Sequence, residues 1–398
     1  MPDPIRPPLL SVPDAQARLF ALGSAPATED APLAAAAGRW AAADIVALRT
    51  QPATAVSAMD GYAVRFDDLP GPLALIGESA AGHAFSGHVG TGETVRIFTG
   101  AAMPSGADSV LVQEEAVRDG AVVRLTGTGP VRGGNVRRQG LDFSSGDLLV
   151  AKGERLTAAR IALAATAGHG AVKVARRLRV AIVASGDELV APGAALTDGG
   201  LPESNGAMLA ALLADLPIAL IELGILPDRL DVITDAFARV DADILVTTGG
   251  ASVGDHDLIR PALAAAGGSL DFWRIALRPG KPMLAGRLRD TIVLGLPGNP
   301  VSAFVTAILF LRPLIAHLSG AADPAPRRFL ATLGEPLPAN DHRQDYLRAE
   351  TRAGRVHSAA RQDSSMLATL ARSDCLIVRA PHAPAAQAGD SVEILALG

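Results

Sequence analysis

Short apolar segments alternate with helix-like segments from residue 178 to about residue 320, and this alternation leaves few architectures open to the chain. The apolar segments have the length of buried strands and lie at 178–184, 218–223, 243–247 and 291–296. The helix-like segments lie at 204–216, 229–240, 257–266 and 301–317. Because strands that alternate with helices form a mostly parallel sheet, we predict a doubly wound α/β domain with helices on both faces.

The segments on either side of this region have a different texture. Residues 11–22 are expected to form a helix that begins at Ser11. Between residues 54 and 138, short β-rich runs are separated by Gly-rich turns, which is typical of a small all-β domain. The Ala-rich stretch 157–167 is again helix-like, and a Pro-rich linker at 323–326 precedes a last set of short strands.

We therefore predict a multidomain fold of α/β plus β class, in which a β domain is inserted into an elongated first domain. The expected boundaries are 1–53 with 139–177 for the elongated domain I, 54–138 for the inserted β domain II, 178–322 for the α/β domain III, and 327–398 for a C-terminal β domain IV.

The charge balance argues against a nucleic-acid or membrane partner. Lys and Arg number 36 and Asp and Glu number 41, the net charge is −5, and aromatic residues make up 4% of the chain. Nucleic-acid surfaces instead use basic patches and stacked aromatic side chains. We expect neither kind of partner.

The cysteine content and the apolar segments indicate the compartment. The single cysteine, Cys375, excludes an internal disulfide framework and a Cys-rich metal site. The N-terminal residues lack the basic and apolar segments of a signal peptide. The longest apolar stretch, 301–311, stops at Arg312 and Pro313 and is too short to span a bilayer. We expect a cytoplasmic protein.

Polar, Gly-rich turns follow all four predicted parallel strands, at 185–188, 227–228, 248–254 and 297–300. Ligands of open parallel sheets bind outside the carboxyl ends of the strands. Glycines let the backbone approach a ligand closely, and the N-termini of helices favour anions. Turn geometry and helix capping would also use these residue types. The coincidence of four such turns favours a site for a phosphate-sized ligand.

The same edge carries five acidic residues and, nearby, two cations. The acidic residues are Asp187, Glu188, Asp228, Asp255 and Asp257. Like charges would repel a phosphate unless a hard cation such as Mg²⁺ stood between them. Arg278 and Lys281 supply compensating positive charge for an oxyanion. The residues therefore predict a site for phosphate, Mg²⁺ and a second oxyanion.

Three further polar residues lie in or beside the β-rich region. Asp60, with Gly61, fits a hairpin turn as well as a binding site, and Thr99 fits a strand-end hydroxyl. Asp142 lies just beyond the region. Their spacing alone does not decide between the two interpretations.

Taken together, the motifs resemble those of the MoeA family of molybdopterin molybdenumtransferases, to which the E domain of gephyrin corresponds. The matching segments follow family order and lie at 57–63, 99–108, 135–142, 185–189, 204–206, 227–228, 248–257, 279–282 and 296–302. The resemblance implies the four-domain architecture predicted above, with a C-terminal β-barrel, and a head-to-tail homodimer. It also implies the Mg²⁺-dependent insertion of molybdate into adenylylated molybdopterin with release of AMP. A molybdopterin adenylyltransferase would be the pathway partner.

The resemblance also assigns roles to residues. The family's catalytic positions correspond to Asp60, Thr99, Asp142, Glu188, Arg278 and Lys281. The metal ligands would be Asp228, Asp257 and Glu188. The substrate-binding positions would be Gly186, Asp187, Ser204, Asn205, Gly249, Gly250, Ser252, Pro297, Gly298, Asn299 and Pro300. Asp60, Thr99 and Asp142 would come from the partner subunit.

Two departures and three alternatives accompany this resemblance. Arg278 stands where the family usually has Lys, and Asp363 stands where it has Gly, beside Ser364. A nucleotide pyrophosphatase acting on another adenylylated substrate and a non-catalytic dimeric scaffold are the alternative functions. Tungstate is an alternative to molybdate because the two oxyanions have nearly the same size and charge.

Overall fold

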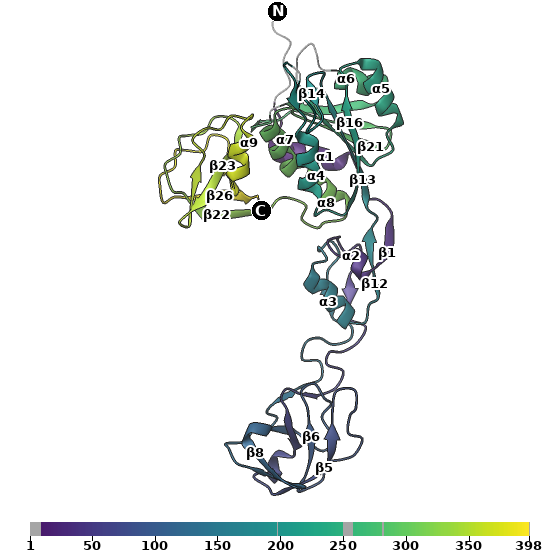
Figure 1. The fold of residues 1–398 in the computed structure, drawn as a ribbon, viewed down its shortest axis with the longest axis vertical. Coiled ribbons are helices and arrows are strands. Elements are labelled where there is room, and N and C mark those ends of the chain that lie inside the picture. Colours follow the sequence, from purple (N-terminus) through teal and green to yellow (C-terminus); the bar gives the residue numbers. More distant parts are fainter. Residues whose placement is uncertain (1–8, 197, 250–257, 281, 398) are drawn as a thin grey trace, which may run out of the picture.

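The computed structural model describes residues 9–196, 198–249, 258–280 and 282–397, which form an elongated molecule (Figure 1). An α/β unit lies at one end with a C-terminal β unit beside it, and a second β unit lies at the other end. A narrow unit, which we call the elongated unit, connects the two ends. The multidomain α/β plus β class predicted from the sequence is confirmed.

The α/β unit contains one sheet with the strand order β16-β13-β17-β21-β20-β18. Its four parallel strands are β13 (Leu178–Ser185), β16 (Ile218–Leu226), β17 (Ile244–Thr248) and β21 (Thr291–Leu296). These are the four strands expected from the sequence. An antiparallel pair, β18 (Ser269–Arg274) and β20 (Pro282–Leu288), extends the sheet beyond β21 and was not predicted.

Successive residues of the central strands enter different cores, which makes the sheet doubly wound. In β13, Leu178, Val180 and Ile182 pack into one core, whereas Ala181 and Val183 pack into the other. The first face is covered by α1 (Val12–Ala21), α4 (Asn205–Leu213), and α7 (Pro300–Thr306) with α8 (Arg312–Leu318). The second face is covered by α5 (Leu230–Arg239) and α6 (Ile259–Ala265).

Helix α1 packs on the α/β unit and not on the elongated unit, to which residues 1–53 were expected to belong. Val12, Ala15 and Leu19 are buried in the first core of the sheet. Gln16 donates from Nε2 to the carbonyl oxygen of Leu309 at 2.6 Å. The sequence shows the apolar face of this helix but not the surface that covers it.

The helix expected at 301–317 is observed from Pro300 to Leu318. A π-helical turn at Ala307–Leu311 joins α7 to α8, so the helical segment continues past Arg312 and Pro313 to Leu318. Its 19 residues are long and apolar enough to cross a membrane, but 78% of its most apolar window is buried inside the protein. It is therefore packed as a core helix.

The elongated unit is small and has its own core. Its elements are β1 (Thr28–Pro32), α2 (Leu33–Ala36), β2 (Ile45–Val46), β11 (Leu148–Val150), α3 (Ala158–Thr166) and β12 (Ala171–Ala175). β1 pairs with β12 and β2 pairs with β11, both antiparallel. The buried side chains of Ala31, Ile45, Val150 and Val174 fill the space between these elements.

The distal β unit is a six-stranded sheet with the order β7-β4-β6-β5-β9-β8. Its strands are β4 (Gly61–Val64), β5 (Leu73–Ser79), β6 (Glu93–Ile97), β7 (Ser109–Val112), β8 (Ala116–Asp119) and β9 (Val122–Leu125). The antiparallel pair β3 (Val56–Ser57) and β10 (Val136–Arg137) adjoins it. The 3₁₀ turns Phe66–Asp68 and Gln113–Glu115 follow β4 and β7.

The strands of the C-terminal unit close into a barrel. The sheet order is β19-β23-β25-β26-β22, and β24 pairs with β23. A bridge between Leu333 and Val356 connects the end of β22 to β24 and closes the ring. The elements are β19 (Leu277–Arg278), β22 (Arg328–Thr332), β23 (Gln344–Arg352), β24 (Arg355–Ser358), α9 (Leu367–Arg372), β25 (Cys375–Arg379) and β26 (Ser391–Ala396). Because β19 belongs to the α/β segment of the chain, it joins the two units.

An ion pair fixes the connection between β12 and β13. Arg176 donates from both terminal nitrogens to the carboxylate of Asp243, at 2.8 and 2.6 Å. The backbone N–H of Arg179 donates to the same carboxylate at 2.7 Å. Burial opposes the charge of Asp243, but these hydrogen bonds outweigh it and lower the pKa of the carboxyl below its ordinary value of 3.8.

We expect Asp243→Asn to lower the free energy of unfolding by about 2 kcal/mol at neutral pH, because a charge-assisted pair is lost. A carboxyl whose folded pKa is lowered stabilises the protein above its unfolded pKa, and that contribution is lost as the pH falls through the folded pKa. The difference in melting temperature between the unaltered chain and Asp243→Asn should therefore be largest at pH 6 and should shrink below pH 3.8. Calorimetry over this range measures it.

Asp241→Asn is the matched control. Its carboxylate pairs with Arg179 at 2.5 Å but is 82% exposed, so its removal should change stability little. Equal losses in the two variants would contradict the role given to Arg176 and Asp243.

Candidate functional site

The turns after β13 and β16 meet at the carboxyl edge of the α/β sheet. The hydroxyl of Ser185 donates to Oδ1 of Asp228 at 3.2 Å. The backbone N–H of Asp228 donates to Oδ1 of Asp187 at 2.9 Å. Parallel pairing of the two strands places their ends together, so Asp187 and Asp228 lie on adjoining turns of this edge.

The turns after β17 and β21 approach the same place through glycines. Gly249 has a φ of +88°, and a Cβ there would lie 2.6 Å from the carbonyl oxygen of Ser185. Gly298 faces it, since a Cβ at Gly298 would lie 3.6 Å from the Cα of Gly249. Three strand ends therefore meet with backbone against backbone, and only glycine fits at position 249.

Helix α4 contributes Asn205 to this edge. Its Nδ2 donates to the carbonyl oxygen of Gly298 at 2.8 Å, which fixes the turn after β21. Its Oδ1 is buried and has no hydrogen-bond partner among the residues described. A buried acceptor without a partner is rare in folded proteins, so this oxygen lacks a donor that another group would have to supply.

The start of α4 is held by a residue that the sequence analysis did not single out. The carboxylate of Glu203 accepts from the backbone N–H of Gly206 at 2.9 and 3.1 Å. Ser204 makes no side-chain capping bond. An acidic residue ahead of the first helical turn was the available signal, because carboxylates are favoured at helix N-termini.

Glu188 lies beside the turn after β13. A Cβ at Gly186 would come within 2.8 Å of Oε2 of Glu188, so this carboxylate lies against the backbone of the turn. The strands β14 (Leu189–Val190) and β15 (Leu201–Pro202) pair directly behind it. Glu188 therefore lies on the same turn as Asp187.

The carboxylates of this edge suit a magnesium ion that also binds substrate. In the described part of the chain, no three His, Cys, Asp or Glu side chains are grouped closely enough to hold a metal by themselves. Mg²⁺ is usually held by one or two carboxylates together with substrate phosphates and water. The pair of Asp187 and Asp228 fits that donor set.

Several predicted site residues lie outside the described residues. They are Gly250, Ser252, Asp255, Asp257 and Lys281.

Arg278 contacts carboxylates of the C-terminal barrel. Its Nε and Nη2 each lie 2.8 Å from an oxygen of Asp345, and Nη2 lies 3.2 Å from Asp341. The hydrogen bond to Asp345 raises the pKa of the guanidinium. In this arrangement Arg278 joins the α/β unit to the barrel, and its positive charge is matched by carboxylates. Arg278, Tyr346 and Gln362 line a cavity of about 420 Å³ between the two units.

The departure at Asp363 leaves the contact of Ser364 intact. Asn299 donates from Nδ2 to Oγ of Ser364 at 3.1 Å, and the N–H of Val301 donates to the Ser364 carbonyl oxygen at 3.1 Å. The carboxylate of Asp363 instead accepts from the N–H and hydroxyl of Ser365. The turn containing Asn299 and Pro300 is thus held by the barrel.

Asp60 and Thr99 form a hydrogen-bonded pair in the distal β unit. The backbone N–H and the hydroxyl of Thr99 both donate to Oδ1 of Asp60, each at 2.7 Å. These two bonds lower the pKa of the Asp60 carboxyl, and the backbone bond has the larger effect. The positive charge of Arg96 lowers the pKa further. The pair is therefore preformed, with Asp60 ionised at neutral pH.

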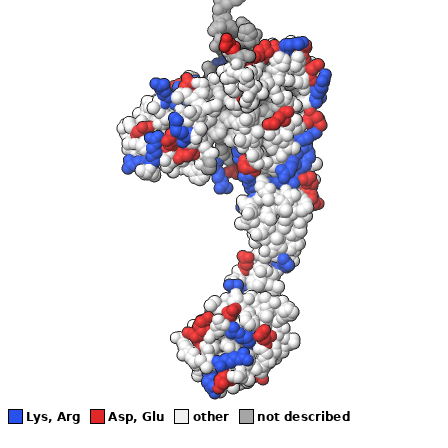
Figure 2. All heavy atoms as spheres, in the orientation of Figure 1, with Lys and Arg blue, Asp and Glu red and all other residues white. Residues whose placement is uncertain are grey.

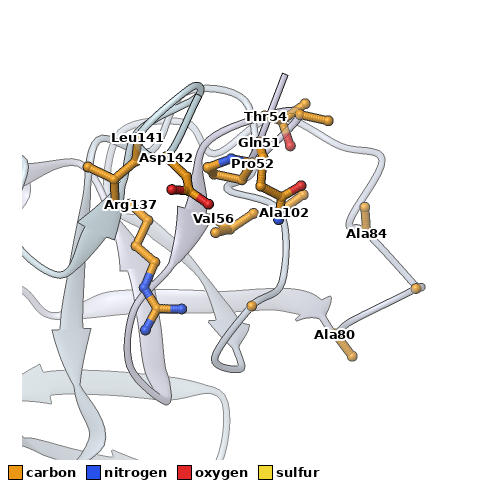
Figure 3. A pocket seen from close by; sticks show the side chains of 13 residues that line it. Gln51, Pro52, Thr54, Val56, Ala80, Ala84, Ala102, Arg137, Leu141 and Asp142 are labelled. Atoms are coloured by element: carbon orange, nitrogen blue, oxygen red, sulfur yellow. The ribbon is translucent and has the colours of Figure 1, made fainter. Parts of the chain in front are cut away.

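Asp142 lines a cavity of about 660 Å³ where the β unit meets the elongated unit. Figure 3 shows its carboxylate beside Gln51 and Pro52, with Arg137 extending below Leu141. No hydrogen bond within the described residues involves the Asp142 carboxylate. A charged acceptor is therefore available at the wall of this cavity.

A single chain does not bring these two groups of residues together. Asp60, Thr99 and Asp142 belong to the end of the molecule that carries the β unit, and the sheet edge lies at the opposite end (Figure 1). Figure 2 shows charges of both signs over the two ends, whereas the elongated unit between them is nearly uncharged on this face.

Comparisons with known proteins match all three parts of the chain. Residues 10–168 match the MoeA N-terminal region (domain I and II), residues 181–317 a probable molybdopterin binding domain, and residues 331–397 the MoeA C-terminal region (domain IV). Molybdopterin molybdenumtransferase from Haemophilus influenzae is 37% identical over 92% of this chain and 93% of its own. Molybdopterin molybdenumtransferase 2 from Mycobacterium tuberculosis is 33% identical over 87% of this chain and 89% of its own.

Solved structures agree with the sequence relatives. The MoeA protein of Pyrococcus horikoshii OT3 superimposes with a TM-score of 0.82 at 26% identity, over 98% of this chain and 100% of its own.

We expect Gly249→Ala to lower the free energy of unfolding of the α/β unit by about 2 kcal/mol or more, because the new methyl group meets the Ser185 carbonyl and the left-handed backbone disfavours alanine. Gly298→Ala is the control, since its Cβ would make only ordinary contact at 3.6 Å. Melting curves of the two variants measure the difference. Similar melting temperatures would show that the edge is less tightly closed than described.

Proposed function

Because the chain belongs to the MoeA family of molybdopterin molybdenumtransferases, we propose that it inserts molybdate into adenylylated molybdopterin, with Mg²⁺ bound and with release of AMP. The enzyme acts in molybdenum cofactor biosynthesis. The observation that carries the finer proposal is the contact of the Asp187 carboxylate with the backbone of Asp228, at the edge where the turns at Gly249 and Gly298 pack closely.

The glycine turns would bind the phosphate part of the substrate. Gly249 and Gly298 leave the backbone uncovered by side chains, so backbone N–H groups can approach phosphate oxygens closely. The buried Oδ1 of Asn205 would accept a hydrogen bond from a pterin N–H, since a ring with several N–H donors satisfies such an acceptor. These contacts would bind and orient the substrate.

Asp228, with Asp187 beside it, would hold Mg²⁺, and Glu188 and Asp257 are proposed to assist. When bound, the ion neutralises phosphate oxygens and so favours departure of AMP. Ser185 orients the Asp228 carboxylate by its hydrogen bond at 3.2 Å. Lys281 would supply positive charge for molybdate, while Arg278 holds the barrel against the site through Asp345.

A head-to-tail homodimer would complete the site. In it, Asp60, Thr99 and Asp142 of one subunit would face the sheet edge of the other, which accounts for their separation within one chain (Figure 1). The elongated unit carries exposed apolar side chains that such a dimer could cover, namely Val46, Leu48 and Leu148, which are 37%, 62% and 56% exposed. Burial of these side chains would favour association.

We place the enzyme in the cytoplasm, after the reaction that adenylylates molybdopterin. Its substrate carries an adenylyl group, so a molybdopterin adenylyltransferase must act before it. Mass balance requires that each turnover consumes one molybdate and releases one AMP.

We expect Asp228→Ala to reduce AMP release from adenylylated molybdopterin by about 100-fold or more, because a metal ligand is lost. Release by the unaltered chain should require both molybdate and Mg²⁺. Asp235→Ala is the matched control, since this exposed carboxylate lies on α5 and pairs with Arg239 on the same helix. AMP release that does not depend on molybdate would instead indicate a nucleotide pyrophosphatase. If no AMP is released at all, the non-catalytic dimeric scaffold would be the remaining function.

The shared site predicts complementation between two inactive chains. Co-expressed Asp60→Ala and Asp228→Ala chains should recover about a quarter of the activity, because half of the dimers are mixed and each mixed dimer has one intact site. The measurement is AMP release by the mixture and by each variant alone. If the mixture stays as inactive as its components, the two residues do not act in one shared site.

A further inference from the structure

Arg96 lies on the segment that leads to Thr99 and contacts the neighbouring segment that carries Asp60. It is on β6, directly opposite Tyr62 of β4. Its guanidinium carbon lies 5.2 Å from the centre of the Tyr62 ring and 4.9 Å from that of Phe98. Cations are attracted to aromatic rings at such distances. Since Tyr62 follows Asp60 closely and Phe98 directly precedes Thr99, one guanidinium contacts a ring from each segment.

The hydrogen bonds of Arg96 reach the backbone around Asp60. Nη1 donates to the carbonyl oxygen of Gly61 at 3.1 Å. Nη2 donates to Oε1 of Gln113 at 2.6 Å, and the backbone N–H of Gln113 donates to the Asp60 carbonyl oxygen at 3.1 Å. The planar guanidinium holds both donors in a fixed geometry, so these contacts restrain the peptide units on the C-terminal side of Asp60.

Arg96 does not pair with the Asp60 carboxylate itself. Thr99 supplies two hydrogen bonds to Oδ1, and Oδ2 has no hydrogen-bond partner among the described residues. Arg96 therefore orients the carboxylate and adds positive charge near it without covering it. Oδ2 remains open to a ligand.

We propose that Arg96 is a positioning residue, whose guanidinium fastens the Asp60 segment to the Thr99 segment and so aims the Asp60 carboxylate at the substrate. The functional part of this inference rests on the proposed molybdenum insertion, in which Asp60 takes part. The structural part does not depend on that reaction.

Nuclear magnetic resonance of the full-length chain, labelled with ¹⁵N-threonine, tests the structural part. Arg96→Met should weaken the hydrogen bond from the Thr99 N–H to Asp60 and move the Thr99 amide proton upfield. In an Asp60→Ala background, where that bond is already lost, adding Arg96→Met should cause no comparable further shift. An unchanged Thr99 resonance in Arg96→Met, or an equal shift in both backgrounds, would overturn the proposal.

Turnover tests the functional part. Arg96→Met should lower kcat for AMP release by about tenfold with the chain still folded, because small displacements of a positioned group have large effects on rate. Arg96→Lys keeps the charge but lacks the planar pair of donors, so it should recover only part of the loss. Full recovery with Lys would show that charge alone matters and would overturn the positioning role.

Arg118→Met is the matched control. Arg118 lies on β8 of the same unit, and its Nε donates to the Gly120 carbonyl oxygen at 2.8 Å, away from Asp60. It should leave kcat and the Thr99 resonance unchanged; equal effects in the two variants would overturn the proposal. If the unaltered chain releases no AMP, the proposed function fails, while the Thr99 resonance still decides whether Arg96 fixes Asp60.

Discussion

The burial of β13 on both faces and its pairing on both edges determine where the rest of the site can lie. β13 pairs in parallel with β16 on one side and with β17 on the other. Its side chains alternate between the two cores of the sheet, so neither its register nor its direction can change without exposing apolar surface. The turn after Ser185 therefore has a fixed position, and the turns that hold Asp228 and Gly249 pack directly against it.

The sequence was sufficient to predict this arrangement where local pattern and tertiary structure agree. The four parallel strands were expected within three residues of their observed ends, because each is a short apolar run followed by glycine or polar residues. The antiparallel pair of β18 and β20 was missed, because it interrupts the alternation of strand and helix. The contacts of Arg278 were also missed, because Asp345 lies 67 residues further along the chain and local sequence cannot indicate that distance. For the same reason, the sequence did not show that the apolar face of α1 packs on this sheet.

The units are joined by charged contacts and by shared apolar packing. Tyr346, Leu376 and Leu395 of the barrel pack into the first core of the α/β unit. Arg155 of the elongated unit and Arg312 of α8 both contact Asp215, at 3.3 and 2.6 Å. Arg176 and Asp243 fix the next connection, and Arg278 and Asp345 fix the barrel. The elongated unit, the barrel and the distal β unit each also have a core of their own. The relative orientation of the units depends on these arginines together with the apolar core that the barrel shares with the α/β unit.

In the proposed site shared between two subunits, it matters that each subunit's groups are already ordered before the subunits meet. If the groups from each subunit had to be ordered when the subunits meet, the entropy lost by those side chains would oppose association and reduce the precision of the site. The distal unit avoids that loss, because Thr99 already binds Asp60 and Arg96 already restrains the Asp60 backbone within a single chain. The sheet edge is likewise ordered by contacts of its own, such as that of Asn205 with Gly298. In the proposed dimer, association would then have to set only the relation between two rigid surfaces, and the contacts that orient the units within each chain would determine how accurately those surfaces meet.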